Sequence, residues 1–148
     1  MDYNEHSIKT IASNIKRTLS RLNIKSNIEI RNYGKVILVE NDKYGTEEHL
    51  YFWIRLLPSR DLTNSTYKIE LSTVVIPKSL RRKGVFTSII NSLNNCKYID
   101  SVWITSVCTP EMFGWCNKNG TKLRKIGECD FEVLKKFENF EILKMDKR

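Results

Sequence analysis

The chain has 148 residues, enough for one domain of ordinary size, and its hydrophobic fraction of 41% excludes an intrinsically disordered protein. Its 25 lysines and arginines against 17 aspartates and glutamates give a formal charge of +8, which favours an anionic partner such as a phosphate group, free or within nucleic acid. No apolar run approaches the roughly 18 residues of a membrane span, and residues 1–10 are too polar for a secretory signal, so we expect a cytoplasmic protein with no membrane partner.

The cysteines and histidines do not indicate a metal site. Four cysteines occur without a CxxC pair, and the chain has only two histidines to accompany them. We therefore expect no metal ion, and we expect reduced, mostly buried thiols at Cys96, Cys108, Cys116 and Cys129.

An amphipathic helix is predicted near the N-terminus. Apolar residues recur at intervals of three and four positions from Ile8 to Leu22, which places them along one stripe of a helix. Ser7 precedes this stripe and belongs to the residue types that cap a helix start. The cationic side chains fall mainly off the stripe, at Lys9, Lys16, Arg17 and Arg21.

Strands are predicted after this helix. The segments 28–31, 35–40 and 50–57 are rich in β-branched and aromatic residues and are separated by polar, glycine-containing or proline-ended stretches, which is typical of consecutive antiparallel strands. After a loop at 58–66, residues 67–76 begin by alternating between apolar and polar side chains. This alternation puts Tyr67, Ile69 and Leu71 on one face of the strand and Lys68, Glu70 and Ser72 on the other.

A basic turn and a second helix follow Pro77. Proline cannot donate to a sheet ladder, so the strand is expected to end there and to pass into a turn at 78–84. The helix after the turn has its apolar side chains on one side, at Val85, Phe86, Ile89, Ile90 and Leu93.

The last third of the chain is expected to alternate between strands and helices. Residues 101–107 are predicted as a strand, and Thr109-Pro110-Glu111 supplies a capping hydroxyl, a proline at the first helical position and an acid in the first turn of a helix that Gly120 ends. Beyond it we predict a strand at 121–126, a short helix or turn at 131–137 and a second strand at 140–145.

The order of these elements describes one mixed unit. No linker, internal repeat or low-complexity tract divides the chain. We therefore predict a single domain over residues 1–148, of the α/β class and the α+β type.

The basic turn has the features of a phosphate-binding site. The first N–H groups of a helix are unpaired and its dipole is positive there, so a strand that feeds a glycine-containing turn and a helix can hold a phosphate. Arg81, Arg82 and Lys83 add three cations to this turn. The alternative is an ordinary solvated connection.

The segment around this turn resembles the acetyl-CoA-binding stretch of the GNAT superfamily of N-acetyltransferases. Residues 70–93 read ELSTVVIPKSLRRKGVFTSIINSL, and the resemblance extends over 67–121. The family turn has Arg or Gln, two residues, Gly, one residue and then Gly or Ala, and these positions are Arg81, Gly84 and Phe86 here. The resemblance implies a GNAT-like fold with a mixed, mostly antiparallel sheet flanked by helices, and transfer of an acetyl group from acetyl-CoA to an amine.

The same resemblance implies which residues bind acetyl-CoA. The amides at the end of the strand would face the thioester and the pantetheine arm, and the turn with the first helical residues would hold the pyrophosphate. The residues so assigned are Val74, Val75, Ile76, Arg81, Arg82, Lys83, Gly84, Val85, Phe86 and Thr87.

Acetyl transfer to an amine also needs a proton acceptor, a donor to the thioester oxygen and a proton source for the thiolate. Glu70 matches the general base of several family members, although it can equally be an ion-paired surface carboxylate, and the amide of Val74 is the expected oxyanion donor. Where the family has a proton-donating Tyr, this chain has Cys116, which is either that donor or a buried structural thiol, and water or Tyr98 are the other sources. Trp115 beside it is expected to pack in the core.

Other functions remain open at this level. The charge also suits a nucleic-acid-binding module or a partner associated with nucleic acid, and Phe86 and Cys116 suit an inactive GNAT-like fold with a binding or inhibitory role. A cysteine enzyme that pairs Cys116 or Cys108 with His49 has no nucleophile signature in its favour. The acceptor amine can belong to a protein, a small molecule or a nucleobase, and it is expected to contact the loops at 44–49 and 58–66. The protein is expected to be a monomer or a homodimer.

Overall fold

Seven short strands form one sheet in the computed structural model, which describes residues 3–59, 66–105, 110–120, 123–127 and 130–134. Three α-helices and two short 3-10 helices accompany the sheet within these residues. In chain order the elements are α1 (Glu5–Arg21), β1 (Asn27–Arg31), η1 (Asn32–Gly34), β2 (Val36–Glu40), β3 (Tyr51–Pro58), β4 (Tyr67–Val75), η2 (Lys78–Lys83), α2 (Val85–Asn94), β5 (Ile99–Ile104), α3 (Pro110–Lys118), β6 (Leu123–Lys125) and β7 (Phe131–Val133).

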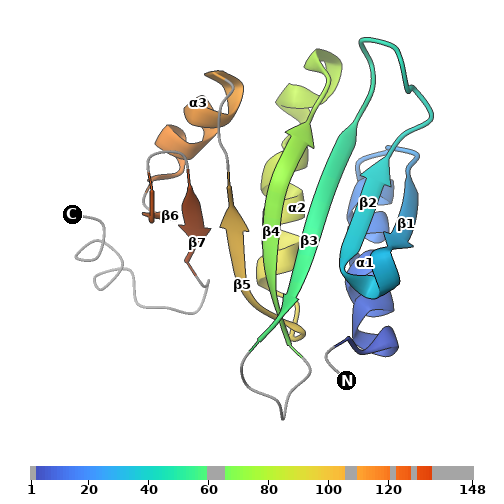
Figure 1. Ribbon diagram of the computed structural model, residues 1–148. Coiled ribbons are helices and arrows are strands. Elements are labelled where there is room, and N and C mark those ends of the chain that lie inside the picture. Colours follow the sequence, from blue (N-terminus) through green and yellow to red (C-terminus); the bar gives the residue numbers. More distant parts are fainter. Residues whose placement is uncertain (1–2, 60–65, 106–109, 121–122, 128–129, 135–148) are drawn as a thin grey trace.

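The sheet is mixed and mostly antiparallel, as predicted. Its strand order is β1-β2-β3-β4-β5-β7-β6, and the pair β4–β5 is parallel while the other neighbouring pairs are antiparallel. Helix α2 connects the two parallel strands, as a parallel connection requires a crossover. Helices α1 and α2 lie side by side behind the sheet in the view of Figure 1 and cover the same face.

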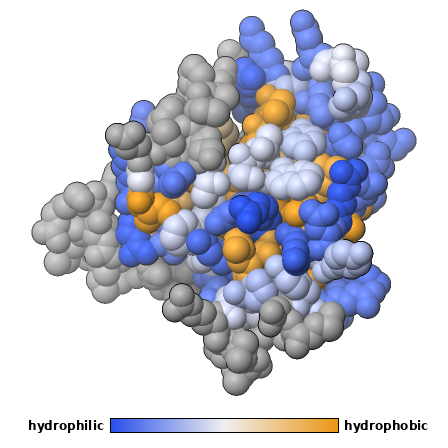
Figure 2. Space-filling model, viewed as in Figure 1, coloured by the Kyte–Doolittle hydropathy of each residue, from blue (hydrophilic) through white to orange (hydrophobic). Residues whose placement is uncertain are grey.

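The two faces of the sheet differ in character. Alternate residues of β3 and β4, such as Phe52 and Ile69, point toward the helices and are buried. Figure 2 shows the opposite face, which we call the outer face, as a mixture of hydrophilic and apolar surface. The strand registers place on the outer face Tyr51, Trp53, Arg55, Lys68, Glu70, Trp103, Arg124 and Glu132.

Helix α1 begins earlier than predicted, and its cap is Asn4 rather than Ser7. The Asn4 side-chain oxygen accepts the backbone N–H of Ser7 at 2.9 Å, which satisfies one of the unpaired first-turn donors. The predicted apolar stripe is confirmed, because Ile11, Ile15 and Leu19 are fully buried. Burying each of these side chains stabilises the fold by about 1.5 to 3 kcal/mol relative to leaving it exposed.

The ladder between β3 and β4 contains a bulge near the end of β4. Ile54 pairs with Leu71 and Trp53 pairs with Thr73, so Ser72 is the extra residue of β4. A bulge bends its strand and increases the local twist. The last residues of β4 therefore leave the direction set by the first part of the strand.

One predicted element is wrong and several lie outside the described residues. Phe131–Val133, which was expected to belong to a short helix or turn, is strand β7, because it pairs on one side with β5 and on the other with β6. Strands β1 to β4 agree with the predictions to within one residue, and β6 lies within the predicted strand at 121–126. Strand β5 begins two residues earlier than predicted and ends at Ile104, before the predicted end at 107. The predicted strand at 140–145, the capping Thr109 and the cysteines Cys108 and Cys129 are not among the described residues.

Candidate cofactor-binding site

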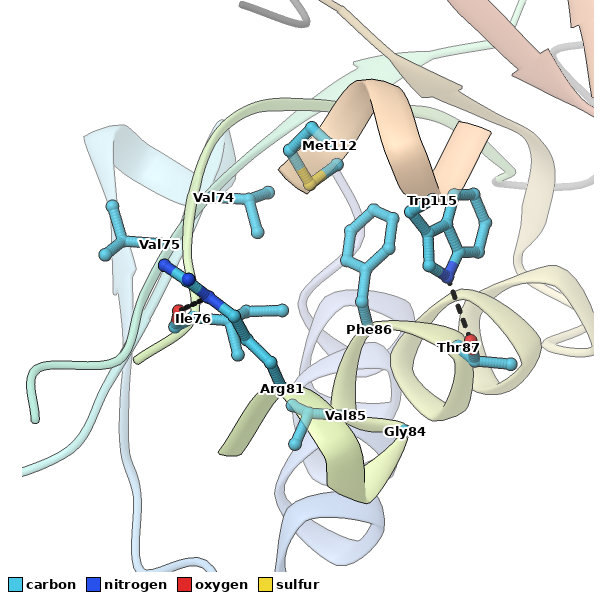
Figure 3. Close-up of a pocket in the computed structure, with 10 residues that line it drawn as sticks. All are labelled: Val74, Val75, Ile76, Arg81, Gly84, Val85, Phe86, Thr87, Met112 and Trp115. Atoms are coloured by element: carbon cyan, nitrogen blue, oxygen red, sulfur yellow. Dashed lines mark hydrogen bonds between the residues drawn. The ribbon is translucent and has the colours of Figure 1, made fainter. Parts of the chain in front are cut away.

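A cavity of about 230 Å³ opens where β4 ends and α2 begins. Strands β4 and β5 pair only as far as Leu71 and Ile104 within the described residues, and the N–H of Thr105 still reaches the carbonyl of Leu71 at 3.1 Å. Strand β4 then runs on to Val75. Figure 3 shows the side chains that line the cavity, which are Val74, Val75, Ile76, Arg81, Gly84, Val85, Phe86, Thr87, Met112 and Trp115.

The connection from β4 to α2 is shaped by Pro77 and Gly84. Pro77 is buried and begins the 3-10 helix η2, and Gly84 ends it with φ of 69° and ψ of 29°. This left-handed conformation costs a residue with a Cβ about 1 to 2 kcal/mol, which explains glycine at the position. Gly84 then starts α2, where its carbonyl accepts the N–H of Ser88 at 2.9 Å.

The start of α2 presents main-chain donors to the cavity. The N–H groups of Val85, Phe86 and Thr87 have no acceptor within the helix, since they belong to its first turn. Gly84 offers no side chain to cap them. These three residues and Gly84 all line the cavity, so an anion in it would meet the positive end of the helix.

The cations of the turn differ in their placement. Nε of Arg81 donates to the carbonyl oxygen of Ile76 at 3.0 Å, and the guanidinium consequently lies beside the end of β4 (Figure 3). Lys83 is exposed in the same turn. The side chain of Arg82 is not among the described parts of the chain.

Aromatic side chains form the wall opposite β4. The Phe86 ring is buried, lies 6.3 Å from the ring of Phe52 and meets Trp115 edge to face at 4.6 Å. Nε1 of Trp115 donates to Oγ1 of Thr87 at 2.9 Å, which ties α3 to α2. Because the Phe86 ring points into the core, it does not fill the turn where the family pattern has a small residue (Figure 3).

Glu70 lies on the outer face and not in the cavity. Its Oε2 accepts from Nη1 of Arg55 at 3.2 Å, and Nζ of Lys68 is 3.7 Å from Oε1. The side chain of Glu70 is 18% exposed. The alternative of an ion-paired carboxylate is therefore confirmed, with Lys68 and Arg55 as the two partners.

Cys116 lies in the core on α3. Its side chain is 2% exposed, and burial raises the pKa of its thiol to about 11. A thiol with so high a pKa gives its proton to a thiolate of ordinary pKa, near 8.5, only against an unfavourable gradient. The geometry therefore favours the structural alternative for Cys116, and Cys96 is likewise buried and free.

Met112 and Trp115 were not predicted to line the site. Trp115 was expected in the core, and it is half-buried between the core and the cavity. The two residues are three positions apart on α3, so they share one face of that helix. This spacing was the available signal, but nothing in the sequence indicated that the face would meet α2.

Comparison with known proteins adds no family. No protein-family model matches the chain, and no curated protein is significantly similar to it.

None of the described helices is long and apolar enough to cross a membrane. Among the described residues, His, Cys, Asp and Glu side chains form no group of three or more that would hold a metal ion.

Proposed function

We propose that this protein is an N-acetyltransferase of the GNAT type, which moves an acetyl group from acetyl-CoA to an amine. The observation that carries the proposal is the cavity at the end of β4, which is lined both by apolar side chains and by a turn that favours anions. The pantetheine arm of acetyl-CoA needs apolar side chains around it, and its pyrophosphate needs groups that attract an anion. Support also comes from the parallel pair β4–β5, because ligands of such sheets bind beyond the carboxyl ends of the parallel strands.

The proposal gives each part of acetyl-CoA its own contacts. The pyrophosphate accepts hydrogen bonds from the first amides of α2 and is attracted by Arg81 and Lys83. The pantetheine arm passes along Val74 and Ile76, with Met112 and Trp115 on the other side. The amide of Val74 donates to the thioester oxygen as negative charge develops there.

Glu70 is the carboxylate that the proposal assigns to the amine proton. It lies on β4 on the outer face, on the opposite side of the strand from the buried Leu71. Four residues separate it from Val74, which is roughly 13 Å of strand, so the proton would pass through water. Water is also the proposed proton source for the departing thiolate, in view of the raised pKa of Cys116.

The binding test is the melting temperature with and without acetyl-CoA. A ligand at one hundred times its Kd stabilises the native state by about 2.7 kcal/mol, which in a domain of this size raises the melting temperature by about 5 to 10 °C. Lys83→Gln should weaken binding several-fold, whereas Lys35→Gln, which removes an equally exposed charge beside η1, should not. Millimolar acetyl-CoA without any shift would overturn the proposal, and a shift with an oligonucleotide alone would favour the nucleic-acid alternative.

The catalytic test compares two outer-face carboxylates. Glu70→Gln should lower kcat more than it changes the affinity for acetyl-CoA. Glu132→Gln is the matched control, because Glu132 is also 18% exposed and also pairs with an arginine, Arg124. Equal effects of the two variants would remove Glu70 from the mechanism and would leave acetyl-CoA binding untouched.

A further inference from the structure

Four side chains gather on the outer face at the ends of β2 and β3. Nε2 of His49 is 2.9 Å from Oε2 of Glu40, and the His49 ring centroid is 5.4 Å from that of Tyr44 and 5.8 Å from that of Tyr51. We call Glu40, Tyr44, His49 and Tyr51 the aromatic–acid cluster. The side chain of His49 is 19% exposed, whereas Tyr44 is 82% exposed, so the cluster is half-buried at His49 and open to solvent at Tyr44.

The strand register places this cluster beside the candidate cofactor cavity. Glu40 pairs with Tyr51, and Tyr51 pairs with Val75, which lines the cavity. Paired residues on adjacent strands are about 5 Å apart, so Glu40 is roughly 10 Å from Val75. Glu70 lies roughly 16 Å from Val75 along β4, which makes the cluster the nearer of the two candidate proton acceptors.

The loop that carries the cluster is acidic in a basic protein. Residues 40–49 contain four carboxylates and one lysine, a formal charge of −3, whereas the whole chain carries +8. Oγ of Ser79 in η2 also donates to Oε2 of Glu48, so this loop contacts the basic turn. An anionic group is therefore favoured at the turn and a cationic group at the loop.

The contact with Glu40 determines which nitrogen of His49 is basic. A carboxylate only accepts hydrogen bonds, so in the neutral imidazole Nε2 carries the proton and donates it to Glu40, and Nδ1 has the lone pair. Within the described part of the chain, Nδ1 has no hydrogen-bond partner. The titratable groups that contact His49 there are Glu40 of β2, Tyr44 of the loop and Tyr51 of β3.

We propose that the aromatic–acid cluster binds the acceptor as a cationic primary amine, and that Nδ1 of His49 takes the proton of this amine in place of Glu70. This inference rests on the acetyl transfer proposed above. The tyrosine rings and Glu40 attract the ammonium group, and Glu40 stabilises the imidazolium that forms. Glu40 is thus a positioning residue for His49.

The proposed step balances in atoms and charge. The ammonium gives one proton to Nδ1, and the neutral amine then attacks the thioester carbon. The C–N bond forms and the C–S bond breaks, with the electron pair of that bond leaving on sulfur. The second N–H proton reaches the thiolate through water, and His49 later releases its proton to water.

The binding part is tested by proton NMR with phenylethylamine as the probe. The chain has two histidines, so its imidazole signals can be assigned with His49→Gln and His6→Gln. Phenylethylamine should shift the His49 signal and leave that of His6, whereas O-phosphoethanolamine, whose phosphate opposes the acidic loop, should shift neither. If the chemical shift of the His49 signal does not change with phenylethylamine at up to tens of millimolar, the proposed amine site is wrong.

The catalytic part is tested by the rate of CoA release with the same amine. His49→Gln keeps a donor toward Glu40 but has no basic nitrogen, so kcat/KM should fall about 10²- to 10⁴-fold and the acid limb of the wild-type pH profile should disappear. His6→Gln removes the other imidazole, which is exposed at the start of α1, and should change kcat/KM less than two-fold. A His49→Gln variant with the wild-type rate and pH profile would overturn the role of His49.

The outcomes also separate this inference from the proposed function. If the wild-type protein does not bind acetyl-CoA, the proposed acetyltransferase function is refuted, while a shifted His49 signal would still show an amine site. Acetyl-CoA binding with turnover that survives in His49→Gln but is lost in Glu70→Gln would keep the acetyltransferase and refute the inference.

Discussion

The turn between η2 and α2 gives the sharpest prediction, through the substitution Gly84→Ala. Gly84 has φ of 69°, and a Cβ built there meets no atom within 4 Å, so the cost is one of backbone conformation and not of packing. The left-handed conformation costs alanine about 1 to 2 kcal/mol, and the lower entropy of the unfolded chain returns about 0.4 to 1 kcal/mol. We expect a net loss of about 1 kcal/mol and a fall of about 2 to 4 °C in melting temperature.

Two other glycines are the controls for this substitution. Gly34 has φ of 93°, and its Cβ would lie 2.8 Å from Cδ1 of Ile8, so Gly34→Ala adds an overpacking cost of about 1 to 3 kcal/mol. Gly114 lies within α3 with open space around its Cβ, so Gly114→Ala should stabilise by about 0.5 to 1 kcal/mol. Stability should decrease in the order Gly114→Ala, wild type, Gly84→Ala, Gly34→Ala.

Thermal and urea unfolding measure these differences, and a binding titration completes the experiment. The methyl group of Gly84→Ala lies at the cavity wall, so the affinity for acetyl-CoA should fall by more than ten-fold although the fold survives. A Gly84→Ala variant as stable as Gly114→Ala would refute the left-handed turn. One that loses 1 kcal/mol of stability but binds acetyl-CoA like the wild type would refute the placement of the pyrophosphate.

Two further outcomes follow from α3. Acetyl-CoA should change the tryptophan fluorescence of the wild type but not of Trp115→Phe, because Trp115 lines the cavity while Trp53 and Trp103 lie on the outer face. A fluorescence change in Trp115→Phe as large as that in the wild type would contradict this. Burial raises the pKa of the Cys116 thiol to about 11 in the fold, so the thiol of the unfolded state ionises first as pH rises. From pH 9 to 11 the free energy of unfolding of the wild type, measured by denaturant titration, should therefore fall by about 2 kcal/mol more than that of Cys116→Ala. An equal fall in the two proteins would place the thiol outside the core.

Local patterns determined most of the elements and the whole of the candidate turn. The alternation in residues 67–72 and the three- and four-residue spacing in α1 depend only on which face is buried, so β4 and the stripe of α1 were predictable. Pro77 and Gly84 act through their own backbone chemistry, which made the turn predictable as well. Asn4 was missed as the cap because Ser7 is also a capping residue type and lies next to the same stripe.

Tertiary structure alone decided which segments meet. Phe131–Val133 is a strand because β5 offers it an edge, and a segment this short does not specify a strand by its own pattern. The same holds for the cavity wall at Trp115 and for the pairs of Arg55 with Glu70 and of His49 with Glu40, which depend on strand register and helix docking. Periodicity in a sequence reports the buried face of each element, but the partner across that face is set by contacts between residues that are distant in the chain.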